Sequence, residues 1–394
     1  MSTLKVDAIR HNSATSDAIT TAADGTCTAR ITSINGGSAL SHRNVLINGA
    51  MTISQRGSTF SHLGSSNTNI LTMDRWKIRR SGSNNFDTTI THSTDTPDGF
   101  LNSLKITPDT TETPTGTMNG LIEQQIEGQS LQHFAYGTSS AKSITASFYA
   151  KSGSQNNGHN YTLQLRKYDS SDNTRIVTKA FTVTSSWQRF TMTFPGDTSN
   201  DIKNSTDYTG FEFIFQLATG PDDLVAEQPT WTSTFTNWRG VTGNSNFMDN
   251  TSNEFYVTGC QLEVGDTATS FEHRSVNEEL IRCYRYYYRM DGDNNKTYMI
   301  GMSDNDNLNI YGLFHFPVPM RTAPGSIDQS GDASHYKVRR DTTQTCTAVP
   351  AFIDGTQFAC RVNFPRSGHG WGTGQMLWCQ GGSSSSYIGF SAEI

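Results

Sequence analysis

The sequence predicts an all-β protein made of two β-sandwiches joined by one short helix. Three observations predict this class. Aromatic residues are plentiful, with 21 Phe and 14 Tyr, although only 34% of the chain is hydrophobic and 17% is charged. Apolar residues recur two apart in many short segments, which is the period of a half-buried strand. Glycine-rich and polar turns separate those segments, and such turns are typical of a sandwich. The expected order is a short N-terminal anchor, a jelly roll, a connecting helix and a smaller C-terminal sandwich.

Residues 1–43 are predicted to be a short attachment segment. Residues 4–9 fit one strand, and the turn residues Asp24 and Gly25 fit a hairpin. A segment of this length cannot bury a core of its own, so we expect it to pair with another protein. A frayed terminus is the alternative. An alternation of side chains argues against fraying: Thr28, Arg30 and Thr32 against Ala29, Ile31 and Ser33.

Residues 44–274 are predicted to form a jelly-roll β-sandwich. Strand-like segments place Ile144, Ala146 and Phe148 on one face, and likewise Phe211, Phe213 and Phe215. The number and length of these segments fit a jelly roll. Trp76 and Trp187 lie in strand-like motifs and are expected in the core.

Residues 275–290 are predicted to form the connecting helix. Ser275 and Glu278 have the spacing of a capping box. Apolar side chains then follow at helical spacing, and we expect them to be covered by the second domain or by other copies of the chain. The residues of this oligomer or interdomain face are Leu280, Tyr284, Tyr287 and Tyr288.

Residues 291–394 again alternate strands and turns, which predicts a second, smaller sandwich at the distal tip. No solenoid period, collagen triplet or long heptad run is present. The sequence therefore predicts no long shaft.

Charge and hydropathy exclude several classes of partner. The net charge is −6 and the basic residues form no stripe, so no nucleic-acid partner is expected. No apolar run approaches the ~20 residues of a membrane span, so no membrane insertion is expected. The first residues lack the apolar centre of a signal peptide, so we expect synthesis in a cytoplasm without export by the usual route. The six cysteines contain no C-x-x-C and are expected to be small buried residues.

Neither of two acidic groups predicts chemistry, and the expectation is a protein without catalytic residues, cofactor or metal. Glu123 and Glu127 lie four residues apart, about 13 Å on a strand, whereas glycosidase carboxylates lie about 5–9.5 Å apart. Asp291, Asp293 and Asn295 begin like a calcium loop, but Lys296 and Met302 stand where that loop needs Gly and Glu. A polar turn is the expected structure there.

Two aromatic stretches are candidate glycan-binding sites. Trp231, Trp238 and Arg239 lie in one polar stretch, and His369 and Trp371 lie in a glycine-rich one. An exposed aromatic ring can stack on a sugar while polar neighbours bind its hydroxyls. The alternative for each tryptophan is core or inter-subunit packing.

Several stretches resemble tail-fibre and related virion proteins of tailed bacteriophages, particularly marine ones. They are NVLINGAMTISQRG (44–57), TMDRW (72–76), IEQQIEG (122–128), ITASFYAKSG (144–153), QLEVGDTATSFEHRS with EELIRCYRYYYR (261–275, 278–289) and FPVPMRTAP (316–324). The resemblance implies a jelly roll similar to carbohydrate-binding modules, and a homotrimer.

The function that this resemblance implies is a tail fibre or receptor-binding protein. It would sit on the virion tail, docked to a tail or other virion protein through residues 1–43, and would bind host surface glycans. Three alternatives remain open at this point. They are a capsid-mounted head fibre or decoration protein, a polysaccharide-degrading tail enzyme, and a bacterial carbohydrate-binding module.

Overall fold

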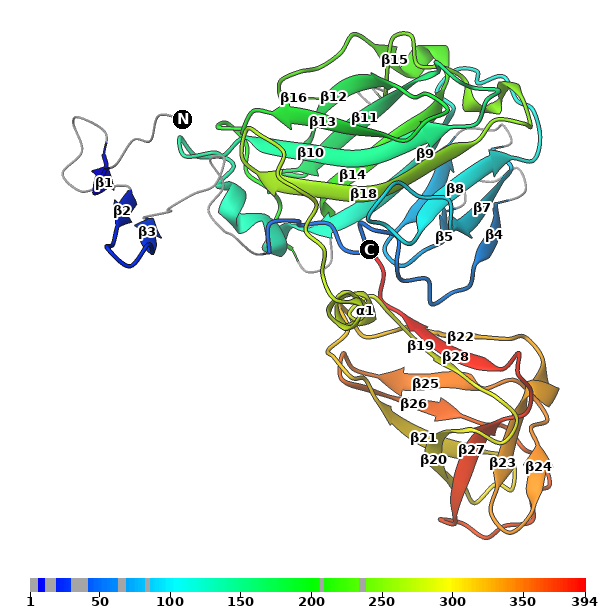
Figure 1. The fold of residues 1–394 in the computed structure, drawn as a ribbon. Coiled ribbons are helices and arrows are strands. Elements are labelled where there is room, and N and C mark those ends of the chain that lie inside the picture. Colours follow the sequence, from blue (N-terminus) through cyan, green and yellow to red (C-terminus); the bar gives the residue numbers. More distant parts are fainter. Residues whose placement is uncertain are drawn as a thin grey trace.

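A computed structural model describes residues 6–10, 19–29, 42–62, 69–81, 86–205, 209–233 and 239–394. The described chain is almost entirely β-structure, which confirms the predicted fold class. Figure 1 shows a large sandwich, a smaller C-terminal sandwich and a small N-terminal sheet. The N-terminal sheet lies to one side of the large sandwich and is separated from it.

The large sandwich packs a six-stranded sheet on a seven-stranded one. The first has the order β13-β10-β18-β8-β7-β4, with bounds β4 Thr59–His62, β7 Thr88–Ser93, β8 Ser103–Pro108, β10 Ile144–Ser152, β13 Gln188–Phe194 and β18 Phe255–Val264. The second has the order β16-β12-β11-β14-β9-β6-β5, with bounds β5 Asn69–Leu71, β6 Lys77–Ser81, β9 Asn119–Glu127, β11 Asn160–Tyr168, β12 Thr174–Thr182, β14 Thr209–Thr219 and β16 Thr232–Ser233. Shorter elements connect them: η1 Gly128–Phe134, η2 Pro221–Asp223, η3 Phe247–Asp249, and the parallel pair β15 Leu224–Val225 and β17 Gly240–Val241.

The aromatic alternation predicted from the sequence forms the core between these two sheets. Phe148 of β10 lies edge-to-face on Phe215 of β14, with ring centroids 4.8 Å apart. Phe211 and Phe213 are fully buried beside them. Within the seven-stranded sheet, the antiparallel pairing of β11 and β14 brings Leu163 opposite Phe215, and both side chains are fully buried.

The two tryptophans expected in this core have different environments. Trp76 is fully buried, and its Nε1 donates to the Asn48 carbonyl at 3.0 Å, which confirms that prediction. The prediction for Trp187 is wrong, because Trp187 is only half-buried. It precedes β13 on the outer side, where its Nε1 donates to Asp95 Oδ1 at 3.0 Å and its ring packs on Tyr256.

The connecting helix is shorter than the predicted 275–290. Helix α1 spans Val276–Tyr284, and the Ser275 hydroxyl caps it by accepting from the Glu278 backbone N–H at 3.2 Å. Tyr287 and Tyr288, expected on the helix, lie on strand β19 (Tyr287–Asp291). The reason is tertiary pairing, since β19 adds to β28 with Tyr288 opposite Phe390, and aromatic residues favour a strand as readily as they continue a helix.

The C-terminal sandwich packs a three-stranded sheet on a seven-stranded one. The first has the order β19-β28-β22, with β22 Ile327–Gln329 and β28 Tyr387–Ser391. The second has the order β24-β23-β27-β20-β21-β26-β25, with bounds β20 Thr297–Ser303, β21 Ile310–His315, β23 Tyr336–Arg339, β24 Thr343–Thr345, β25 Ala351–Gly355, β26 Ala359–Asn363 and β27 Met376–Gly381. A short η4 (Ala333–His335) precedes β23. Ile310, Val362 and Phe390 lie fully buried between the sheets.

A charged joint fixes the two sandwiches to each other. Arg285, just after α1, forms an ion pair with Glu127 at the end of β9. Arg75 of the large sandwich pairs with Glu393. Arg321 donates to the Ala392 carbonyl at 2.8 Å, so the end of the chain is held at the same place. We use the term joint for Arg75, Glu127, Arg285, Arg321 and Glu393.

The N-terminal sheet has the order β1-β2-β3, with bounds Ala8–Ile9, Ile19–Thr21 and Cys27–Ala29. The predicted hairpin is present, with Asp24 Oδ1 accepting from the Thr26 N–H at 2.9 Å and Gly25 at φ +85°. The predicted alternation over residues 28–33 lies mostly outside the described residues.

The cysteines whose side chains are described are all buried and free, as the sequence predicted: Cys260, Cys283, Cys346, Cys360 and Cys379.

Candidate functional site

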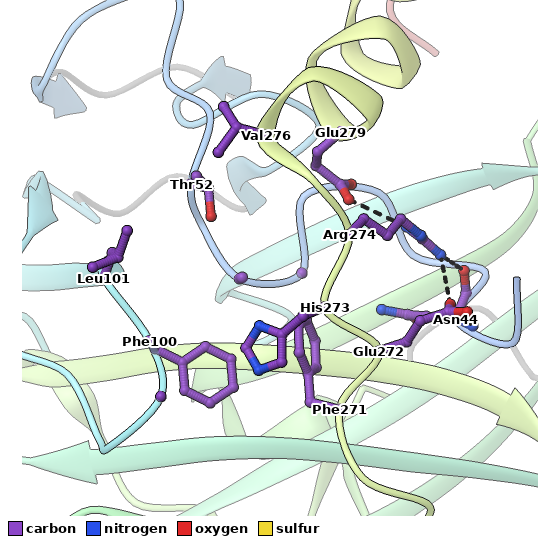
Figure 2. Close-up of a pocket in the computed structure, with 13 residues that line it drawn as sticks. Asn44, Thr52, Phe100, Leu101, Phe271, Glu272, His273, Arg274, Val276 and Glu279 are labelled. Carbon is purple, nitrogen blue, oxygen red and sulfur yellow. Dashed lines mark hydrogen bonds and ion pairs between the residues drawn. The ribbon is translucent and has the colours of Figure 1, made fainter. Parts of the chain in front are cut away.

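A pocket lies where the large sandwich meets helix α1 (Figure 2). Its volume is about 160 Å³, room for a single ring rather than a long chain. Three stretches form it: residues 44–52, the turn before β8, and the segment from β18 to α1. Its lining residues are Asn44, Gly49, Ala50, Thr52, Gly99, Phe100, Leu101, Phe271, Glu272, His273, Arg274, Val276 and Glu279.

One wall of this pocket is aromatic. Phe100 and Phe271 lie with ring centroids 5.1 Å apart, and His273 is 4.8 Å from Phe271 and 5.1 Å from Phe100. Phe100 and Phe271 are half-buried and His273 is exposed, while Leu101 beside them is 76% exposed. Figure 2 shows the three rings grouped on one side of the opening.

The wall opposite the rings is charged and rigid. Arg274 forms ion pairs with Glu272 at 3.2 Å and Glu279 at 3.4 Å, and its Nη1 donates to the Leu46 carbonyl at 3.0 Å. Glu272 Oε2 accepts from the backbone N–H of Asn44 at 2.9 Å. These bonds fix the charged groups in place, and they leave the Arg274 side chain 4% exposed and the Glu272 side chain 13% exposed.

The environment keeps the Glu272 carboxyl ionised. Burial alone would raise its pKa, but the backbone N–H groups of Asn44 and Arg43 and the charge of Arg274 outweigh burial and lower the pKa. An ionised carboxylate accepts hydrogen bonds and does not supply a proton. The pocket is therefore suited to binding a hydroxylated ring, with apolar faces on one side and hydrogen-bonding groups on the other.

Trp231, one of the predicted glycan-binding residues, belongs to the core. It is 8% exposed, its Nε1 donates to the Pro195 carbonyl at 2.8 Å, and its ring packs on Tyr136 and Phe211. The glycan-binding prediction is wrong for this residue, because no ring face is left for a ligand.

Arg239 lies near Trp231 in sequence but forms an ion pair with the buried Asp223 at 3.2 Å. Burial raises the pKa of Asp223 to about 6, with Arg239 opposing the shift. Trp238 lies outside the described residues.

His369 and Trp371 lie together in the C-terminal sandwich. Their rings stack with centroids 5.4 Å apart, and His369 Nδ1 accepts from the Trp371 backbone N–H at 3.1 Å. Trp371 packs against the core of that sandwich. The predicted glycan-binding residues therefore do not form one site. Trp231 and Arg239 lie in the large sandwich, and His369 and Trp371 lie in the C-terminal sandwich.

Three of the acidic residues considered in the sequence analysis, Glu123, Glu127 and Asp291, form ion pairs with basic side chains. Glu123 is fully buried between Lys77 at 3.1 Å and Arg79 at 3.4 Å. Glu127 belongs to the joint. Asp291 pairs with Arg289 at 2.6 Å. Within the described ranges, no three His, Cys, Asp or Glu side chains come together as a metal site, and no described helix is long and apolar enough to cross a membrane.

The pocket residues were not predicted as a site. A signal was present in SFEHRS (270–275), where two ring residues flank a carboxylate and a guanidinium follows. Phe100 follows a turn at Gly99, and nothing local indicates that it meets residues some 170 positions later.

Comparisons with known proteins find weak structural likenesses. No protein-family model and no curated protein matches the sequence. The enzymatically active domain of tailspike protein 4 from Bacteriophage CBA120 shares 13% identity at a TM-score of 0.29, over 56% of this chain and 21% of that one. A family 22 xylan-binding module from Paenibacillus barcinonensis shares 8% identity at a TM-score of 0.28, over 60% of this chain and 100% of that one. A family 22 carbohydrate-binding module from Clostridium thermocellum shares 12% identity at a TM-score of 0.29, over 60% of this chain and 99% of that one. This chain thus spans about a fifth of the tailspike and nearly all of each module.

Proposed function

We propose that the chain is a structural protein of a tailed-phage virion, a tail fibre or receptor-binding protein that attaches to host surface glycans as a homotrimer. Residues 1–43 dock it to a tail or other virion protein. The virion assignment is supported by the sequence resemblance. Four of the resembling stretches, 72–76, 122–128, 278–289 and 316–324, supply Arg75, Glu127, Arg285 and Arg321 to the joint.

Glycan attachment is supported chiefly by the pocket of Figure 2. A sugar ring has an apolar face and a rim of hydroxyls. The rings of Phe100 and Phe271 can take the face, while the Glu272 carboxylate and the exposed His273 ring can bond the rim. A site that holds one ring binds weakly, so a trimer carrying three such sites would bind a repetitive glycan coat by avidity.

The test is a glycan-binding measurement with a matched control. The full chain is titrated by calorimetry with host lipopolysaccharide and capsular polysaccharide, and Phe271→Ala is compared with wild type. Loss of one stacked ring should weaken binding by about tenfold. Phe358→Ala removes a ring that is 61% exposed in the C-terminal sandwich and should leave binding unchanged. Equal affinities for wild type and Phe271→Ala would remove the pocket from the proposal.

Position on the particle is tested by immunogold labelling with antibody against residues 291–394. Label at the tail supports the fibre, and label spread over the capsid supports the head-fibre alternative. Deletion of residues 1–43 should prevent incorporation into particles while the remaining chain folds and assembles. Continued incorporation of the truncated chain contradicts the docking role.

The proposed action is binding without catalysis. Glu123 and Glu127, the carboxylates weighed as a catalytic pair, are each engaged by basic side chains. The carboxyl of Glu272 in the pocket is held ionised, whereas a general acid needs a raised pKa. Prolonged incubation with host polysaccharide should release no new reducing ends, and their appearance would support the enzyme alternative.

A further inference from the structure

The outer face of the seven-stranded C-terminal sheet is apolar and exposed. Five large side chains on its central strands are about half or more exposed: Ile300 54%, Met302 55%, Leu313 59%, Met376 68% and Trp378 47%. Monomeric proteins rarely leave a contiguous group of this kind on one sheet face without a partner.

Strand pairing arranges these residues as rows across the sheet. Ile300 of β20 lies opposite Trp378 of β27, and Trp378 lies opposite Arg339 of β23. On the other side, Gly301 lies opposite Gly312, which places Ile300 beside Leu313 of β21. Leu313 lies opposite Arg361.

One end of this row is positive, and the other end holds a carboxylate within an ion pair. Arg339 stands at one end, 6.0 Å from the Trp378 ring centroid, and no described carboxylate lies within ion-pair distance of it. At the other end, on β25, Asp354 lies opposite Arg361 and pairs with it at 2.7 Å. The row spans six strands, from β23 to β25, and the five spacings between them put its ends about 24 Å apart.

We propose that copies of this chain associate through this face, with the Arg339 end of one row against the Asp354 end of the next. This inference rests on the self-association in the proposed function and names its surface. Aliphatic side chains such as Ile300 and Met302 offer no hydrogen bonds to sugar hydroxyls, so the face suits a protein surface better than a glycan.

The polarity of the row favours another copy of the same chain. Three copies around an axis can bring Arg339 of each row to the Asp354 carboxylate of its neighbour, and two copies face to face can do the same. Asp354 can accept from a second guanidinium while keeping Arg361, because a carboxylate has about four acceptor sites.

The experiment measures the mass of the full chain by light scattering across a dilution series. Ile300→Asp places a charge at the centre of the face and should weaken association at least about 100-fold, leaving a folded monomer. Ile281→Asp is the matched control, because Ile281 is 52% exposed on helix α1 and the helix is the competing self-association surface. It should assemble as wild type does.

A charge exchange tests the pairing of the row ends. Arg339→Asp and Asp354→Arg should each weaken association, and the double variant should recover most of it. Circular dichroism on every variant separates loss of assembly from loss of fold.

The outcomes distinguish this inference from the proposed function. A trimer that survives Ile300→Asp but is lost with Ile281→Asp overturns the face and leaves the trimer standing. A monomeric wild type overturns both the face and the trimer, while glycan binding at the pocket is measured separately. Failure of the double variant to recover assembly overturns the head-to-tail pairing.

Discussion

Arg285 and Glu127 form a two-pronged ion pair that ties the end of helix α1 to the end of strand β9. Arg285 Nε lies 2.9 Å from Glu127 Oε1, and Nη2 lies 2.8 Å from Oε2. Burial alone would raise the pKa of Glu127, but hydrogen bonds from Arg285 and Tyr286 outweigh burial and lower it. The pair stabilises the joint when Glu127 is ionised, and its contribution is lost as the pH falls below the ordinary value near 4.5.

Replacing Arg285 should loosen the joint. In Arg285→Ala, the Glu127 carboxylate, only 4% exposed, keeps Tyr286 as a donor but loses both guanidinium bonds. We expect unfolding free energy to fall by about 1–3 kcal/mol, since hydrogen bonds to charged groups are worth about that much. Urea denaturation measures the loss, and limited proteolysis should cut the junction faster.

The control for this variant is Arg340→Ala. Arg340 pairs with Asp341 at 3.2 Å, but both side chains are exposed, at 41% and 74%. Such a surface pair contributes about 0–1 kcal/mol. A loss in Arg285→Ala no larger than in Arg340→Ala would show that the joint is not held by this pair.

The sandwich cores could be predicted from the sequence because their signal is local. Phe211, Phe213 and Phe215 alternate on one strand, and alternation alone decides which face is buried. Ser275 caps the helix for the same reason, since a cap is set by its next three residues.

The end of that helix could not be predicted, because tertiary pairing decides it. Tyr284, Tyr287 and Tyr288 keep a helical spacing, yet Tyr288 stacks on Phe314 from a strand, with centroids 5.4 Å apart. Two other features also depend on contacts between residues far apart in the sequence: the position of Trp187 outside the core, and the contact between Phe100 and Phe271. They depend on which loops the sandwich brings together.

Gly49 is predicted to tolerate no side chain. A Cβ there would lie 2.1 Å from the carbonyl oxygen of Cys260 on β18, and this atom is backbone and cannot rotate away. Gly49→Ala should therefore lower the melting temperature by several degrees, as expected for about 1–3 kcal/mol of overpacking. Gly325→Ala is the control, because nothing lies within 4 Å of its Cβ position. Similar melting temperatures for both variants would contradict the close approach.

Asp74 should make stability depend on pH between about 4 and 6. It is 1% exposed, and burial raises its pKa from 3.8 to about 6 although Arg56 lies 3.7 Å away and the Gln55 backbone N–H donates to it at 2.9 Å. Ionisation is thus harder in the folded chain than in the unfolded one, so the unfolding free energy falls as pH rises through this window. A shift of about two pKa units corresponds to roughly 3 kcal/mol.

Asp74→Asn removes that ionisation, so wild type should lose stability relative to the variant from pH 4 to pH 7 in urea denaturation. Exposed Asp98→Asn should follow wild type at every pH, and a constant difference between wild type and Asp74→Asn would mean that Asp74 does not titrate in this window.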